Sequence, residues 1–167
     1  APLMLTGRSA KPRRVCCLLA TLNSFVLDFV ARQKVGNVHL NFFIVNQLAV
    51  LGPDVYAEKR KWTGRQTLER WISDRVLKLT CTADDMRTLA EACGLKNAVH
   101  KWNPIERAKL LAELDAAYFL LYDVKRDDAE YILSTFAGTR RRDESDVGRF
   151  KTAELILEEY DRLSAAR

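Results

Sequence analysis

Apolar residues recur at helical spacing near the start of the chain. From Val15 to Val30 they follow one another every three or four positions, which is typical of an amphipathic helix with one broad apolar face. Ser9 fits the N-cap of this helix and Pro12 its first turn, and Gly36 follows its last turn, where a glycine commonly ends a helix. We therefore expect a single long helix in this region.

Two apolar stretches on either side of this helix indicate a small α/β portion. Pro2–Thr6 is typical of a short strand, and its abrupt apolar start indicates that it belongs to a larger fold. Asn37–Leu51 is dense enough in apolar residues to be buried. Its pattern fits a strand as well as a helical turn followed by a strand, and Pro53 ends it in either case. Residues 1–55 are thus expected to form an α/β portion.

From Tyr56 onward the pattern is helical throughout. Apolar positions recur at spacings of three and four residues, between capping residues and glycines. The predicted helices cover Leu68–Leu79, Met86–Cys93, Asn103–Leu121, Asp127–Phe136 and Thr152–Leu163. The second is expected to end at Gly94 and the fourth at Gly138. The predicted fold is mainly α, with a small α/β portion at the N-terminus and a bundle-like helical extension over residues 56–167 packed on it.

The composition is that of an ordinary globular protein, with 48% hydrophobic and 29% charged residues. No run of apolar residues has the length of a membrane span, and no cleavage-site pattern of a signal peptide follows Arg13 and Arg14. The four cysteines form no C-x-x-C pair, so we favour buried core thiols over structural zinc. Reduced thiols fit a cytoplasmic protein that does not associate with membranes.

Positive charge is concentrated in the first half of the chain. Residues 1–82 carry thirteen Lys or Arg against five Asp or Glu, a formal charge of +8. Residues 83–167 carry fourteen against seventeen, or −3. Such an asymmetry is typical of a protein with one surface that binds a polyanion. The alternative is a chance distribution of charge on a surface that contacts only water.

The candidate DNA-binding residues are two basic clusters and the last turn of the first helix. They are Arg32, Lys34, Lys59, Arg60, Lys61, Arg65, Arg140, Arg141 and Arg142. Basic clusters of this kind neutralise phosphates independently of base sequence. Trp62, Trp71 and Trp102 could stack on bases, but their positions beside helical patterns favour packing between helices.

The sequence contains none of the common catalytic motifs. It has no G-x-x-x-x-G-K-[ST] or G-x-G-x-x-G loop, no nucleophile elbow and no His-Glu metal motif. Asp143, Glu144 and Asp146 could form a nuclease-like acidic patch, but they follow three arginines in an expected loop, where local salt bridges are the favoured interpretation. We expect no catalytic residue, metal or cofactor of its own in this chain.

Two stretches resemble the C-terminal region of adenine-N6 DNA methyltransferases of type IIG restriction–modification and phage-defence systems. The first begins Leu22-Asn-Ser-Phe25 and continues to an Asn-x-x-x-x-x-Gln-Leu-x-Val segment, Asn41 to Val50. The second runs from Arg126-Asp-Asp-Ala-Glu-Tyr131 to Glu158-Glu-Tyr-Asp161. The first stretch is also similar to the end of type I specificity-subunit recognition domains, although Ala49 stands where the family usually has Pro.

The resemblance implies that residues 1–55 end a target recognition domain and that a helical extension follows. It also implies a parent enzyme that depends on S-adenosylmethionine and could also cleave DNA. The cofactor-binding motif and the Asn-Pro-Pro-Tyr-type catalytic motif of such an enzyme are missing from this chain, where Asn103-Pro104 is followed by Ile-Glu. The expected partners are double-stranded DNA and the methyltransferase core of the same polypeptide. The alternative is a helical protein–protein module that docks on that core or on a partner subunit.

Overall fold

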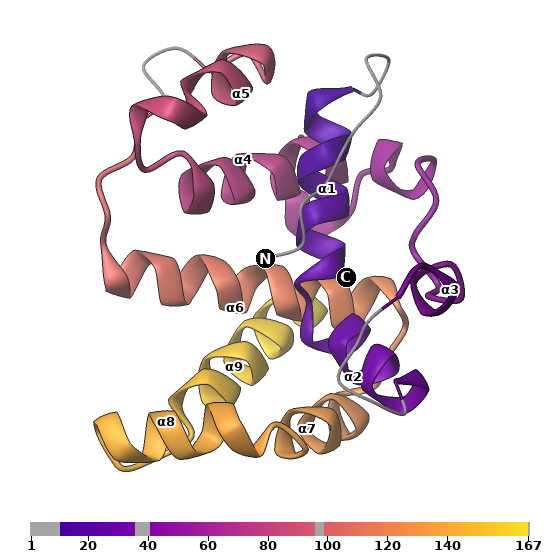
Figure 1. The fold of residues 1–167 in the computed structure, drawn as a ribbon, viewed down its shortest axis with the longest axis vertical. Coiled ribbons are helices and arrows are strands. Elements are labelled where there is room, and N and C mark those ends of the chain that lie inside the picture. The colour runs from indigo at the N-terminus through magenta and orange to yellow at the C-terminus, as the bar shows by residue number, and fades with distance from the viewer. Residues whose placement is uncertain (1–10, 36–40, 96–98, 167) are drawn as a thin grey trace. The chain divides into compact units, whose positions relative to one another are not determined.

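The computed structural model describes residues 11–35, 41–95 and 99–166. Over these residues the chain is entirely helical and contains no strand (Figure 1). The α-helices are α1 (Pro12–Leu22), α2 (Phe25–Lys34), α3 (Phe42–Val45), α4 (Leu68–Thr80), α5 (Arg87–Ala92), α6 (Pro104–Leu121), α7 (Arg126–Ser134), α8 (Ala137–Val147) and α9 (Lys151–Ala165). Three short 3₁₀ helices are η1 (Val55–Ala57), η2 (Lys61–Thr63) and η3 (Asp84–Met86). The prediction of a mainly helical fold is confirmed.

None of these helices is by itself long and apolar enough to span a membrane; α1 and α2, which meet at a bend, have the length and composition only together.

The expected α/β portion of residues 1–55 is wrong for the part of it that the structure describes. Pro2–Thr6 lies outside the described residues. The side-chain oxygen of Asn41 accepts a hydrogen bond from the backbone N–H of Ile44 at 3.0 Å, which starts the single helical turn of α3. Residues 46–54 then form turns and irregular backbone. The apolar density of this stretch therefore belongs to a capped helical turn and a loop, and no partner strand is present in the described part of the chain.

The single long helix predicted near the start is divided into α1 and α2 at Ser24. This residue has extended backbone, with φ −75° and ψ 146°. Its hydroxyl accepts a hydrogen bond from the N–H of Leu27 and donates one to the carbonyl of Thr21. These side-chain bonds take the place of helical backbone bonds, so the apolar periodicity continues across a break in the helix. Ser9 and Gly36, the expected ends, lie outside the described residues.

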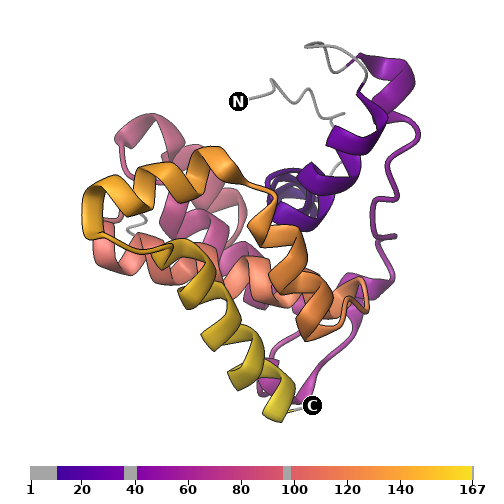
Figure 2. The ribbon, with the colours of Figure 1, turned by 90° about the horizontal axis from the view of Figure 1, so that it is seen from below.

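The structure also differs from the prediction between α7 and α9. One short helix ending at Gly138 and a charged loop were expected, but α7 ends at Ser134 and Gly138 lies within the separate helix α8. Gly148, with φ 74°, ends α8 in the left-handed conformation that glycine adopts without strain. Figure 2 shows the chain reversing between α8 and α9. The charged residues 140–146 therefore lie on a helix rather than in a loop.

The chain divides into two compact units. Unit 1 consists of residues 1–20 and 51–102, and unit 2 consists of residues 21–50 and 103–167. Each unit joins an early segment to a later one, so the grouping differs from the predicted segments 1–55 and 56–167. The assignment of residues 1–55 to the end of a target recognition domain stays a prediction.

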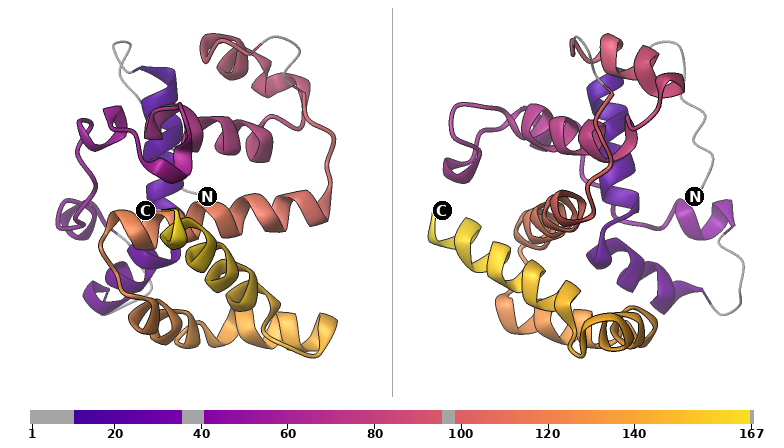
Figure 3. Two further views of the ribbon diagram at one scale, coloured as in Figure 1. Left: turned by 180° about the vertical axis from the view of Figure 1, so that it is seen from behind. Right: turned by 90° about the vertical axis from the view of Figure 1, so that its left-hand side faces the viewer.

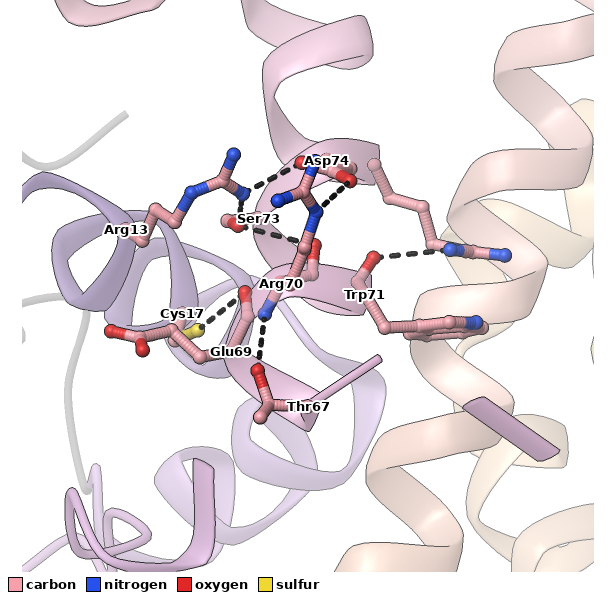
Figure 4. A network of polar contacts seen from close by, with 9 residues as sticks. Arg13, Cys17, Thr67, Glu69, Arg70, Trp71, Ser73 and Asp74 are labelled. Carbon is pink, nitrogen blue, oxygen red and sulfur yellow. Dashed lines mark hydrogen bonds and ion pairs between the residues drawn. The ribbon is translucent and has the colours of Figure 1, made fainter. Parts of the chain in front are cut away.

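In unit 1, α4 forms the core. Its fully buried side chains are Leu68, Ile72 and Leu77. Figure 4 shows how α1 is attached to this helix: Arg13 Nη1 donates to Ser73 Oγ and to Asp74 Oδ1, both at 2.6 Å. Because Ser73 and Asp74 are at most partly exposed, this contact fixes the start of α1 against α4.

All four cysteines belong to unit 1, and all four are buried. Desolvation is the largest cause that raises the pKa of each thiol, namely those of Cys16, Cys17, Cys81 and Cys93. A buried thiol with a raised pKa is a poor nucleophile and behaves as a small apolar side chain. The expectation that these cysteines lie in the core is confirmed.

In unit 2, α6 forms the core, with Tyr118 and Phe119 fully buried. Helix α9 packs against α6 and crosses it obliquely, as the left view of Figure 3 shows. Tyr160 on α9 is buried, and its hydroxyl donates to the carbonyl of Val124 at 2.9 Å. Asp115 is also buried in α6 and accepts a hydrogen bond from the backbone N–H of Phe25, the first residue of α2, at 2.9 Å.

Candidate nucleic-acid interface

A closed loop before α4 carries the first predicted basic cluster. The N–H of Leu68 donates to the carbonyl of Glu58 at 2.8 Å and closes the loop. Within it, the Thr63 hydroxyl accepts the N–H of Arg60 at 3.2 Å and lies 2.7 Å from the carbonyl of Gln66, to which it can donate. Thr63 is buried, so these bonds are shielded from water. We call residues 58–66 the basic loop, a segment whose backbone is fixed from both ends.

The aromatic residue of the basic loop points into unit 1. Trp62 lies edge-to-face against Trp71, with ring centroids 5.0 Å apart. The guanidinium carbon of Arg75 lies 3.3 Å from the centroid of the Trp71 ring, so this ring has a cation over one face. The packing role expected for Trp62 and Trp71 is confirmed. Trp102 is 61% exposed, and its packing role stays a prediction.

The cations of the basic loop point to solvent. Lys59, Arg60, Lys61 and Arg65 are all exposed. Arg60 forms an ion pair with Glu58 at 2.7 Å. Within the described residues, Lys59, Lys61 and Arg65 have no ion-pair partner. The loop therefore presents three uncompensated positive charges from a fixed backbone.

Several arginines outside the basic loop form ion pairs within unit 1. Arg13 is paired with Asp74, and Arg14 Nε lies 3.6 Å from Glu69 Oε1. Arg70 also pairs with Asp74, at 3.7 Å. The sequence does not show which arginines form ion pairs, because partners such as Arg13 and Asp74 are 61 residues apart along the chain. Among the described residues of the basic half, the basic loop is the segment that carries three exposed cations without an ion pair.

The second predicted cluster lies on α8, in unit 2. Arg140 pairs with Glu144 at 2.8 Å, and Arg141 and Arg142 are exposed. The helix carries three Arg and three acidic residues, so its formal charge is zero. Its cations occupy the first half and its acids the second, which is opposite to the order that the helix dipole favours.

The acidic patch on α8 has a structural contact. Asp143 Oδ2 accepts the backbone N–H of Thr152, in the first turn of α9, at 2.6 Å. A carboxylate at this position satisfies an N–H that has no partner within its own helix. In the part of the chain that the structure describes, no group of three or more His, Cys, Asp or Glu residues is arranged to hold a metal ion.

Arg32 and Lys34 lie in the last turn of α2, in unit 2. Arg32 binds both carboxylate oxygens of Asp28, at 3.0 and 2.9 Å. Its guanidinium also lies 4.6 Å from the centroid of the Phe136 ring. Lys34 is exposed and has no ion pair among the described residues. The structure therefore leaves Lys34, and not Arg32, as a free cation at this position.

The charge asymmetry of the sequence is also present between the two units. Unit 1 carries fourteen Lys or Arg against seven Asp or Glu, a formal charge of +7. Unit 2 carries thirteen against fifteen, or −2. The basic loop belongs to the unit that holds the positive charge, whereas α8 and α2 belong to the other.

No protein-family model, curated protein or solved structure matches this chain. What the candidate interface can bind follows from its own groups. Lysine and arginine side chains are donors without acceptors, and they bind anions. The loop offers such groups in a row on one short segment.

Proposed function

We propose that this chain is a non-catalytic DNA-binding and scaffold part of a DNA-modifying enzyme, and that its unit 1 binds the phosphate backbone of double-stranded DNA through the basic loop. The observation that carries the proposal is the set of three exposed, unpaired cations, Lys59, Lys61 and Arg65, on one closed loop in a unit of charge +7.

The groups of the loop favour phosphates over bases. Trp62 packs on Trp71, so its ring is partly covered and poorly placed to stack on a base. The backbone N–H groups of Arg60, Thr63 and Gly64 are bonded within the loop. What remains for a ligand is the charged ends of flexible side chains, which bind phosphates and position a protein on DNA without reading its sequence.

The wider setting rests on the resemblance to type IIG adenine-N6 DNA methyltransferases. On this proposal, the methyl transfer and S-adenosylmethionine belong to another part of the parent polypeptide. Unit 1 would hold the duplex, and unit 2 would be a helical scaffold beside the methyltransferase core. The negative formal charge of unit 2 supports a role away from the DNA backbone.

A salt titration tests the DNA-binding part of the proposal. Anisotropy of a short fluorescein-labelled duplex should show binding at low salt. With three phosphate contacts, affinity should fall about fortyfold between about 50 and about 200 mM salt, because each contact releases condensed counterions. The slope should be the same for duplexes of unrelated sequence. Absence of binding even at the lowest salt would contradict the proposal.

A second candidate function is a protein–protein module. It is supported by Phe42 and Phe43 on α3, which are 86% and 75% exposed, since large aromatic side chains in such positions often mark a binding surface. The same titration separates the two functions. A chain that binds no duplex but binds the isolated methyltransferase core in a pull-down would be the module.

A further inference from the structure

Glu58 and Arg60 form an ion pair at the mouth of the basic loop. Arg60 Nη2 lies 2.7 Å from Glu58 Oε2, and the two side chains are 46% and 50% exposed. Both backbones are fixed: the Glu58 carbonyl accepts the N–H of Leu68, and the Arg60 N–H donates to Thr63. The two side chains therefore extend from fixed backbone positions and form their ion pair in solvent, where ion pairs contribute little to stability.

The pair sets Arg60 apart from the other cations of the loop. Lys59, Lys61 and Arg65 have no carboxylate partner within the described residues. Glu58 is the single acidic residue of the basic loop, and one of its carboxylate oxygens lies against Arg60 Nη2, a position that a phosphate oxygen can also occupy. Arg60 is thus bound to an internal anion, as it would be to a phosphate.

We infer that the Glu58 carboxylate occupies the phosphate position on Arg60 and is displaced when the loop binds DNA. This inference rests on the proposed function, because it names which residue regulates affinity at that same site. The exchange lowers the affinity of the loop for small isolated anions, because each of them must displace Glu58 without the help of other contacts. A duplex already held by the three free cations presents a phosphate at high local concentration, so the exchange favours dense polyanions.

Replacing Glu58→Gln tests the inference. Glutamine keeps the backbone carbonyl that closes the loop and removes the charge that competes for Arg60. Duplex affinity at about 0.1 M salt should rise about fivefold, because Arg60 no longer has to leave a carboxylate before it binds a phosphate. The slope of log affinity against log salt should stay the same, because the number of phosphate contacts in the complex does not change. In the double variant Glu58→Gln with Arg60→Ala, the gain should disappear.

The matched control is Glu144→Gln on α8. It removes the same charge and releases an arginine, Arg140, from a pair of similar length and exposure, 2.8 Å at 54% and 45%. Because α8 lies in the acidic unit, duplex affinity should change less than about twofold. Melting followed by circular dichroism checks that both variants fold.

The outcomes separate this inference from the function on which it rests. If wild-type protein binds no duplex, the proposed function fails and the exchange fails with it. If wild-type protein binds through the basic loop but Glu58→Gln has unchanged affinity, the exchange alone is overturned. A salt slope steeper by about 0.9 in Glu58→Gln would also overturn it, because Arg60 would then contact a phosphate only in the variant. An equal gain in affinity in Glu144→Gln would attribute the effect to net charge and would also overturn the proposed exchange.

Discussion

Replacing Lys59, Lys61 and Arg65 together by alanine should lower the affinity for duplex DNA about five-hundredfold at about 0.1 M salt. Each free cation contributes one phosphate contact, and the release of counterions is worth roughly eightfold in affinity per contact at this salt concentration. The loop backbone is held by Thr63 and by the bond between Leu68 and Glu58, so the variant should keep its fold. Fluorescence anisotropy with a labelled duplex measures the change.

A variant with the same change in charge provides the control. Lys109, Lys125 and Lys151 are exposed residues of unit 2 without ion pairs in the described part of the chain. Their joint replacement by alanine should lower affinity less than about threefold.

A third variant, Arg141→Ala with Arg142→Ala, tests the second basic cluster, and we expect a similarly small effect because α8 has no net charge. Equal losses in the loop variant and the lysine control would show that DNA senses total charge and not the loop.

Asp115→Asn should stabilise unit 2 strongly at alkaline pH. Burial raises the pKa of the Asp115 carboxyl from 3.8 to about 7, and the N–H of Phe25 opposes this shift with a smaller effect. Between about pH 4 and about pH 7 the folded protein therefore binds one more proton than the unfolded chain. The contribution of this group to stability is fully present below pH 4 and is lost as pH rises through 7, by about 4 kcal/mol in total.

Asparagine keeps an oxygen that accepts the N–H of Phe25 but never ionises. Urea unfolding at pH 5 and at pH 8 should show the variant more stable than wild type at pH 8 by up to about 4 kcal/mol, with the difference shrinking as pH falls. Asp128→Asn is the control, since Asp128 is exposed in the first turn of α7. Parallel pH profiles for wild type and Asp115→Asn would show that this carboxyl titrates normally.

Helix positions that depend on local signals could be predicted from the sequence. Asn103-Pro104 was expected to begin a helix, and Asn103 Oδ1 does accept the N–H groups of Ile105 and Glu106 at the start of α6. Gly94, with φ 81°, follows α5 as expected. Such signals act over a few residues, so the sequence displays all of their parts.

The errors arose where a local alternative competes with the periodic pattern. Ser24 breaks a continuous apolar stripe because its hydroxyl caps α2, a choice that hydrophobic spacing does not show. The position of Gly138 after an apolar helical pattern predicts a helix end, but this glycine lies near the start of α8. The apolar run around Phe42 fits a strand as well as a helical turn followed by a strand, and either strand needs a partner that the described residues do not provide.

The sequence predicts that the cations of the candidate site are close together, but not which of them are exposed and unpaired. The sequence shows that Lys59, Lys61 and Arg65 lie close together, as it shows for Arg140 and its neighbours. It does not show that Trp62 turns inward against Trp71, nor which arginines of the basic half are held by distant acids. Those facts depend on the packing of α1 and α4, whose residues are far apart along the chain.

Lysine protection on the wild-type chain tests the central claim most directly. Mild acetylation of free and duplex-bound protein, followed by peptide mass spectrometry, reports the reactivity of each lysine in turn. We predict that DNA slows the modification of Lys59 and Lys61 and leaves the rates at Lys109, Lys125 and Lys151 unchanged. Protection of the unit 2 lysines with unchanged reactivity at Lys59 and Lys61 would contradict the assignment of the basic loop as the DNA-binding surface.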